Sequence, residues 1–255
     1  MKVIIEKKDK VCSIGINRPE VKNAVDRETA HLLADAFREF EADESSHVAV
    51  LYGVGGTFCA GADLKALSKD EGNLLNVDMS KDGPMGPTRM QLSKPVIAAI
   101  SGFAVAGGLE LAIWCDMRVV EADATFGVFC RRFGVPLIDG GTQRLPRLIG
   151  QSRALDMILT GRPVESEEAF SMGLANRIVA PGSAKAEAEK LAAQIASFPQ
   201  VCMRSDRNAV YKGFDLDMDR AMDLEFQLGL QVIGSGETKD GATHFTNGKG
   251  RHGVF

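Results

Sequence analysis

Two glycine-rich segments stand out in this 255-residue sequence because each follows a buried apolar run and precedes a helical pattern: residues 53–63 and residues 101–108. Glycine lets the backbone come close to a ligand, and the first N–H groups of a helix have no intrahelical partner. Such N–H groups stabilise a negative charge, either on a phosphate or on an enolate oxygen. Neither segment contains GxxxxGK[ST] or GxGxxG, which disfavours nucleotide binding. Tight packing of strand on helix explains the glycines equally well from these residues alone.

Two carboxylates are candidates for proton transfer. Glu110 follows the second glycine segment inside an apolar stretch, where a carboxylate without a function is costly. The alternative for Glu110 is a first-turn acid that complements the helix dipole. Asp139 precedes Gly140 and Gly141, and the order Asp-Gly-Gly is typical of a turn. For Asp139, therefore, a turn and a catalytic acid both remain open.

The elements around these segments follow from their apolar patterns. Short β-type runs at residues 3–6 and 11–17, with a charged turn between them, predict a hairpin. Asp26 is a candidate N-cap for a helix whose apolar face is Ala30, Leu33, Phe37 and Phe40. Buried strands are expected at residues 47–52 and 96–100, immediately before the two glycine segments, and another at 117–121. Helices are expected from about residue 63 and over residues 109–115.

The rest of the chain divides into an irregular and a helical part. Residues 69–88 have a weak pattern with Pro84 and Pro87, which predicts a flexible segment. From about residue 142 the pattern is almost entirely helical, with breaks at glycines and at Pro199. We therefore expect an α/β core over residues 1–199 and a helical region over 200–255. The last region carries Met218, Met222 and Phe226 at helical spacing, which fits an internal core or an interface between subunits.

Composition and residue spacing disfavour several classes of function. The net charge of −4 supplies no basic field for a nucleic acid. The five cysteines are scattered and odd in number, which predicts reduced thiols and a cytoplasmic protein. The four histidines lie far apart, so no metal site is expected, and no apolar run is long enough for a membrane span.

The glycine segments belong to longer motifs. Residues 57–64, TFCAGADL, resemble the crotonase-family pattern F-x-A-G-A-D-[LI]. Residues 94–112, KPVIAAISGFAVAGGLELA, resemble the second signature of that family, lacking one glycine of the usual triple. Further matches at residues 140–150, 159–161 and 172–175 follow in the family's order and extend the similarity over nearly the whole chain. The sequence is therefore identified as a member of the crotonase (enoyl-CoA hydratase/isomerase) family.

The resemblance implies a fold, a substrate and a binding site. The fold is a crotonase-type ββα spiral core with a helical C-terminal oligomerisation region, assembled as a homotrimer or a dimer of trimers. The substrate is a coenzyme A thioester, with no permanently bound cofactor. The N–H groups of Ala62 and Gly107 would hold the thioester carbonyl oxygen in an oxyanion hole. Residues implied to contact coenzyme A are Lys22, Ala24, Ala60, Ala62, Asp63 and Leu64. A basic tail, Lys249, Arg251 and His252, is either solvated or in contact with the coenzyme A phosphates.

The sequence departs from the family pattern at one position that is catalytic in hydratases. Hydratases of this family use two glutamates to position and split water, and the first corresponds to Glu110. The second belongs to an F-G-x-P-E sequence, which here reads FGVFC and ends at Cys130. A neutral thiol does not replace a carboxylate in activating water. Asp139 is the candidate replacement, since some related isomerases place an acid before a similar glycine.

These considerations leave a leading activity and two alternatives. Hydration of a 2-enoyl-CoA by Glu110 and Asp139 is expected first. Migration of the double bond, with Asp139 as the acid, fits the carboxylates nearly as well. The missing glutamate favours a non-catalytic acyl-CoA-binding relative, and the charge of the chain disfavours an RNA-binding one.

Overall fold

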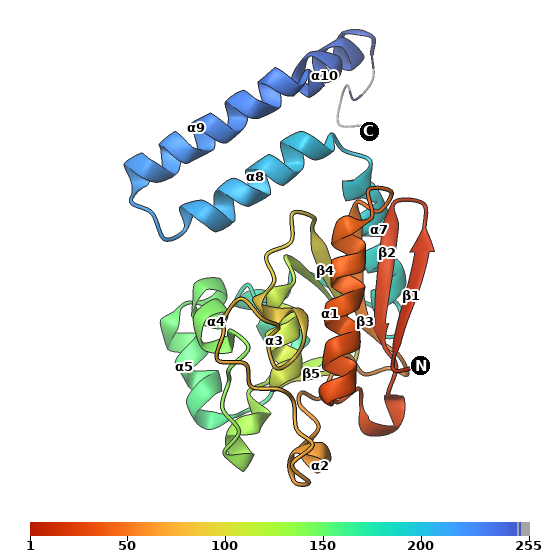
Figure 1. Cartoon of the computed structure of the whole chain (residues 1–255), viewed down its shortest axis with the longest axis vertical. Coiled ribbons are helices and arrows are strands. Elements are labelled where there is room, and N and C mark those ends of the chain that lie inside the picture. Colours follow the sequence, from red (N-terminus) through yellow and green to blue (C-terminus); the bar gives the residue numbers. More distant parts are fainter. Residues whose placement is uncertain (249, 251–255) are drawn as a thin grey trace. The chain divides into compact units, whose positions relative to one another are not determined.

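The computed structural model describes residues 1–248 and 250, and these fall into two compact units, one over Met1–Ala193 and the other beginning at Gln194 (Figure 1). The sequence-based division after residue 199 stays a prediction about domains. No helix among the described residues is both long enough and apolar enough to cross a membrane.

A six-stranded sheet forms the centre of the first unit. Its strands are β1 (Val3–Lys8), β2 (Val11–Ile16), β3 (Val48–Gly53), β4 (Val96–Ile100), β6 (Met117–Glu121) and β9 (Arg177–Val179), in the spatial order β1-β2-β3-β4-β6-β9. The β1–β2 pair is the predicted antiparallel hairpin, and every later pairing in this sheet is parallel. β4 is buried along its whole length, as expected for a parallel strand covered on both faces.

A second, smaller sheet was not predicted. It contains β5 (Phe103–Val105), β7 (Thr125–Gly127) and β8 (Val164–Glu165), in that order. The expectation of an almost purely helical chain after residue 142 is wrong at β8 and β9. Both strands are only two or three residues long, so their local pattern is too short to show alternation, and pairing with distant strands determines them.

Helices and short turns complete the first unit. They are α1 (Arg27–Ala42), α2 (Leu64–Leu67), α3 (Gly107–Trp114), α4 (Gly141–Ile149), α5 (Gln151–Thr160), α6 (Ser166–Ser171), most of α7 (Ala184–Ala196), and the 3₁₀ turns η1 (Pro19–Val21), η2 (Pro87–Arg89) and η3 (Phe129–Phe133). Asp26 caps α1 as predicted, since its side chain accepts the Thr29 N–H at 2.8 Å. The apolar face of α1 is buried, and Phe37 meets Trp114 of α3 edge-on at 4.8 Å between ring centroids.

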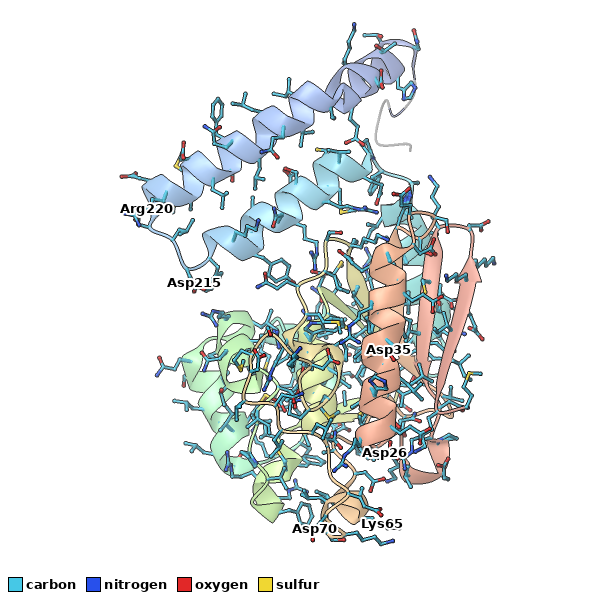
Figure 2. The ribbon with its side chains drawn as sticks, viewed as in Figure 1. Asp26, Asp35, Lys65, Asp70, Asp215 and Arg220 are labelled. Carbon is cyan, nitrogen blue, oxygen red and sulfur yellow. The ribbon has the colours of Figure 1, made fainter. Side chains whose placement is uncertain are left out.

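The second unit is helical. α8 (Gln200–Gly213) and α9 (Met218–Ser235) form an antiparallel pair, followed by α10 (Glu237–Thr246) (Figure 1). Asp215 lies in the turn between α8 and α9, and Arg220 in the first turn of α9 (Figure 2). Asp217 caps α9 by accepting the Arg220 N–H at 3.0 Å.

Candidate active site

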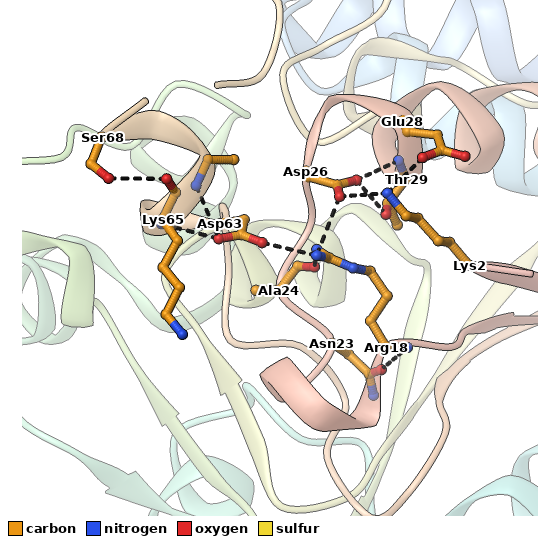
Figure 3. Close-up of polar contacts among 11 residues, drawn as sticks. Lys2, Arg18, Asn23, Ala24, Asp26, Glu28, Thr29, Asp63, Lys65 and Ser68 are labelled. Carbon is orange, nitrogen blue, oxygen red and sulfur yellow. Dashed lines mark hydrogen bonds and ion pairs between the residues drawn. The ribbon is translucent and has the colours of Figure 1, made fainter. Parts of the chain in front are cut away.

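The first glycine-rich loop runs from the end of β3 to α2 and is held by a network around Arg18. Nη2 of Arg18 lies 3.0 Å from Oδ2 of Asp63 and 3.2 Å from Oδ2 of Asp26 (Figure 3). The other carboxylate oxygen of Asp63 accepts the N–H groups of Lys65 and Ala66, which caps α2. Burial raises the pKa of Asp63, but the bonds from Arg18 and from the Ala66 N–H outweigh it and hold the pKa below its ordinary value. The network fixes the end of the loop.

A parallel pairing joins this loop to the segment that follows η1. The Ala60 N–H donates to the Lys22 carbonyl at 3.0 Å, and the Val25 N–H donates to the Gly61 carbonyl at 2.8 Å. The Asp63 N–H donates back to the Val25 carbonyl at 3.0 Å. Residues 22–25 and 60–63, far apart in the sequence, therefore lie side by side.

The residues implied to bind coenzyme A are brought together on this pairing, at Lys22, Ala24, Ala60, Ala62, Asp63 and Leu64. Lys22 and Leu64 are exposed, whereas the three alanines are half-buried. The Asp63 carboxylate is committed to Arg18 and to the cap of α2, so its contribution to a ligand would be through the backbone. That these residues contact coenzyme A stays a prediction.

The two N–H groups implied to form the oxyanion hole lie at the junction of the two glycine loops. Ala62 pairs with Val25 in a bridge whose hydrogen bonds use the N–H groups of Val25 and Asp63, so the Ala62 N–H points away from that partner. Gly107 is the first residue of α3, where helix N–H groups lack intrahelical acceptors. Among residues 1–248 and 250, neither N–H has a hydrogen-bond partner.

The loops meet through glycines that leave no room for a side chain. A Cβ at Gly61 would lie 2.9 Å from the Gly107 nitrogen, and one at Gly108 would lie 2.1 Å from the Cys59 carbonyl oxygen. The Cys59 N–H and carbonyl in turn bond the backbone of β5. The glycines therefore allow the tight packing that was the alternative explanation, and this packing places Gly61, which directly precedes Ala62, against the Gly107 nitrogen.

Ala106 occupies the position of the glycine that the family signature has and this sequence lacks. Its φ of 55° and ψ of −127° are rarely adopted by a residue with a Cβ. This conformation turns the chain from β5 into α3 directly before Gly107. The strain is stored at the residue that orients one of the two N–H groups.

Replacing Ala106 with glycine is expected to raise the free energy of unfolding by about 1 kcal/mol. Strain of about 1–3 kcal/mol would be relieved, and about 0.4–1 kcal/mol would be lost through the greater freedom of the unfolded chain. The melting temperature should rise by about 2–4 °C in thermal unfolding. Ala112→Gly within α3 is the control and should lower stability by about 1 kcal/mol. Equal destabilisation by both variants would contradict the strain at Ala106.

Glu110 is buried, with 2% of its surface exposed. Its Oε1 accepts the Asp139 N–H at 2.9 Å and the Gly141 N–H at 2.8 Å. Glu110, in the first turn of α3, therefore holds the beginning of α4. Oε2 has no hydrogen-bond partner among the described residues. Burial raises the pKa of Glu110 to about 7, and the negative charge of Asp139 contributes to the rise. One oxygen is thus fixed while the other is free to exchange a proton near neutral pH.

Asp139 lies beside Glu110 and is also buried, at 4% exposure. Its Oδ1 accepts the Met85 N–H at 2.9 Å and the Thr88 hydroxyl. No described residue donates a hydrogen bond to Oδ2. Burial raises the pKa of Asp139 above its ordinary value, against the lowering effect of the Thr88 hydroxyl. The backbone does turn after Asp139, since Gly140 has a φ of 95° directly before α4. The Asp139 carboxylate is nevertheless buried inside the protein.

Met85 and Thr88 were missed by the sequence analysis, which treated residues 69–88 as a flexible segment. Met85 is 1% exposed, and a Cβ at Gly107 would lie 2.7 Å from its Sδ. Thr88 is buried as well, and Arg144 of α4 donates to its carbonyl at 2.7 Å. One feature of the sequence could have indicated that this segment is buried: the apolar Met85 lies between Pro84 and Pro87 in an otherwise polar region. Residues 85–88 therefore form one wall of the site, next to Gly107.

Cys130 lies in η3, directly after β7, and is buried at 7% exposure. Burial raises the pKa of its thiol, and the negative charge of Glu110 raises it further. The thiol is therefore neutral and within the electrostatic reach of Glu110. The sequence position implied for a second glutamate holds no carboxylate.

Two expectations from the sequence remain, one about a metal site and one about the basic C-terminal tail. Within residues 1–248 and 250, no three His, Cys, Asp or Glu side chains gather as a metal site would require. Lys249, Arg251 and His252 lie outside the described residues.

Comparisons with known proteins agree with the motifs. The enoyl-CoA hydratase/isomerase family model matches residues 6–251. The chain is 35% identical over 248 residues to a crotonyl-CoA hydratase of Syntrophomonas wolfei, covering 95% of this chain and 94% of that one. It is 34% identical, with the same coverage, to a short-chain-enoyl-CoA hydratase of Clostridium acetobutylicum.

The fold also agrees with that of a solved enoyl-CoA hydratase structure. The crystal structure of an enoyl-CoA hydratase from Mycobacterium tuberculosis H37Rv superimposes with a TM-score of 0.91 at 33% identity, covering 96% of each chain. The expected crotonase fold with C-terminal helices is therefore confirmed. The chain belongs to the enoyl-CoA hydratase/isomerase family, the crotonase family.

Proposed function

We propose that the protein adds water reversibly to a 2-enoyl-CoA thioester. The observation that carries the proposal is the pair of unpartnered N–H groups at Ala62 and Gly107, next to a buried carboxylate at Glu110. Backbone donors fixed at a helix start are oriented before charge develops, and each is typically worth about 3 kcal/mol of barrier. The relatives' names, which describe hydratases of enoyl-CoA substrates, support the same reaction.

In the proposed mechanism, the thioester carbonyl oxygen accepts both N–H groups and Oε2 of Glu110 takes a proton from water. Water attacks C3, and the electron pair of the double bond moves onto the carbonyl oxygen as an enolate. Asp139 in its protonated form delivers a proton to C2, the proton on Glu110 then restores Asp139, and the addition is complete. Asp139, with Oδ2 unpartnered and its pKa raised by burial, is the second carboxylate available for proton transfer.

Migration of the double bond is the second candidate reaction. The presence of Cys130 in place of the second glutamate favours it. Isomerisation needs a proton removed beside the thioester and returned two carbons away, with no water to activate. Glu110 and Asp139 suffice for that shuttle, whereas water activation would lack the glutamate that Cys130 replaces.

The test offers purified protein a trans-2-enoyl-CoA and the matched 3-enoyl-CoA. Loss of conjugated-thioester absorbance with a product heavier by one water supports hydration. A change of absorbance without a change of mass supports isomerisation. Absence of both reactions, together with tight binding of acyl-CoA, would leave the non-catalytic relative as the function. Calorimetry with an acyl-CoA and its free acid should show binding of the thioester only.

The pH dependence of turnover follows from Glu110. A base must be ionised to take a proton, so the pKa of about 7 predicts that kcat/KM rises through about pH 7 and levels off above it. The measurement is kcat/KM between pH 5 and 9 at constant ionic strength. A profile that stays flat down to pH 5 would contradict a base whose pKa is raised to about 7, because a glutamate with its ordinary pKa of 4.5 stays ionised over that range.

We also propose a trimer or a dimer of trimers. Met218, Met222 and Phe226 were expected to lie either in an internal core or at an interface, and at 72%, 62% and 64% exposure they are not an internal core. An apolar stripe of this kind on α9 is typical of a surface that another subunit covers. Light scattering should give a mass that is a multiple of three chains. A monomer at micromolar concentration would contradict the proposal.

A further inference from the structure

Arg144, in the first half of α4, donates hydrogen bonds to Asp139 and to Thr88, the residue that binds the Asp139 side chain. Its Nη1 donates to the Asp139 carbonyl at 2.9 Å, and its Nη2 donates to the Thr88 carbonyl at 2.7 Å. Thr88 in turn donates its hydroxyl to Oδ1 of Asp139. The three residues therefore form a closed ring of hydrogen bonds that joins η2 to the beginning of α4.

Glu110 binds the other backbone polar group of Asp139. The Asp139 N–H donates to Oε1 of Glu110 at 2.9 Å, whereas the Asp139 carbonyl accepts from Arg144. Both backbone polar groups of Asp139 are thus committed, one to a carboxyl group and one to a guanidinium. A movement of Asp139 relative to Glu110 would break at least one of these bonds.

The two glycines that follow Asp139 leave room for the side chains of Arg144 and Glu110. A Cβ at Gly140 would lie 2.2 Å from Nη1 of Arg144, and a Cβ at Gly141 would lie 2.9 Å from Oε1 of Glu110. The Asp-Gly-Gly sequence therefore does more than form a turn. It admits both side chains that hold the backbone of Asp139.

The stability of α4 does not account for the placement of Arg144. A cation near the beginning of a helix opposes the helix dipole, whereas a cation in the last turn, where Arg147 lies, is favourable. Arg144 is half-buried, and its two carbonyl partners belong to buried residues. Hydrogen bonds from a charged donor are stronger than neutral ones, so they offset the cost of this position.

We propose that Arg144 is a positioning residue for proton transfer: it holds the Asp139 and Thr88 carbonyls together and thereby fixes the Asp139 carboxyl group relative to Glu110. The inference rests on the proposed function, in which Glu110 and Asp139 move the protons. The guanidinium stays protonated and only holds its partners. The planar fork of arginine suits two carbonyls at once, and the ammonium of lysine does not reproduce it.

The positive charge of Arg144 has a second effect, on the protonation of the carboxyl groups. It lowers the pKa of Glu110, against the larger effects of burial and of the negative charge of Asp139. At Asp139 it opposes burial together with Arg89 of η2. The neutral thiol of Cys130 adds no charge to this group. Loss of the Arg144 charge should therefore raise the pKa of Glu110 further, whereas lysine should preserve it.

The experiment measures kcat, and kcat/KM between pH 5 and 9, for the full-length variants Arg144→Lys and Arg144→Met on the enoyl-CoA that proves active. Both should lose about 10²-fold in kcat, because a small misplacement of a catalytic group has an effect of this size. The rise of kcat/KM with pH should move to higher pH in Arg144→Met and stay in place in Arg144→Lys. Arg147→Met, which removes an exposed arginine from the same helix, is the control and should leave both quantities near normal.

The pH profile separates positioning of the acids from a purely structural contact, because loss of stability alone would not make Arg144→Met differ from Arg144→Lys. Folding is checked by melting temperature and by calorimetry with butanoyl-CoA. If Arg144→Met does not fold, Arg144→Gln replaces it, since glutamine keeps one donor without the charge.

Two outcomes would overturn the inference, and they are distinguishable. Near-normal kcat in the folded Arg144 variants, or the same pH profile in all variants, would refute the role of Arg144 and leave the proposed function intact. Absence of turnover by the unaltered protein on either enoyl-CoA would overturn the proposed function and this inference together.

Discussion

Glu110→Gln is expected to lower turnover of an enoyl-CoA by about 10²–10⁴-fold, the usual contribution of a positioned acid–base group. The amide oxygen of glutamine can still accept the N–H groups of Asp139 and Gly141, which Oε1 accepts at 2.9 and 2.8 Å. The start of α4 therefore stays in place while the proton acceptor is lost. Calorimetry with butanoyl-CoA should show an affinity close to that of the unaltered protein, because carbonyl binding depends on backbone N–H groups.

Glu121 provides a matched control for this substitution. It is 5% exposed, and its Oε1 accepts the Ser101 hydroxyl at 2.9 Å and the Ala184 N–H at 3.1 Å. Glu121→Gln therefore also replaces a buried, hydrogen-bonded carboxyl group, one whose partners differ from those of Glu110, and should keep near-normal turnover. If Glu110→Gln retained turnover as well as Glu121→Gln does, Glu110 would not be the base.

Asp139→Asn is expected to cost about 10²–10⁴-fold in turnover as well, if Asp139 moves a proton. Its carboxylate has a second role, since Oδ1 accepts the Met85 N–H at 2.9 Å and the Thr88 hydroxyl. Asparagine keeps an oxygen for those two donors and loses only the ability to carry the proton. Cys130→Ser should cost far less, because a neutral thiol is not the proton-transfer group.

Thr88→Val separates the two roles of Asp139. It removes the hydroxyl donor to Oδ1 but leaves the carboxylate ionisable, so it should alter KM and stability more than kcat. A large loss of kcat in Thr88→Val with near-normal turnover in Asp139→Asn would assign Asp139 to holding residues 85–88. Near-normal turnover in Asp139→Asn with none in Cys130→Ser would contradict the proton-transfer role directly.

Local patterns predicted most of the larger elements correctly, because their signals lie within a few residues. The antiparallel hairpin, the Asp26 cap and the buried strands β3, β4 and β6 formed as expected. The smaller sheet and β9 did not follow from the sequence. Strands of two or three residues have no period of their own, and partners far along the chain decide whether they form.

The sequence by itself determined the family through its glycine-rich motifs, and the resemblance to that family implied backbone donors at Ala62 and Gly107. It offered Glu110 as a candidate acid through its apolar setting, and Asp139 through the resemblance to related isomerases; both roles stay predictions. Only the tertiary structure decided what these acids contact. The bonds that hold Glu110 come from residues 139 and 141, and those that hold Asp139 come from residues 85 and 88. Burial raises the pKa of both carboxyl groups, and hydrogen bonds from these partners oppose the rise, so both pKa values depend on segments that meet only in the folded chain.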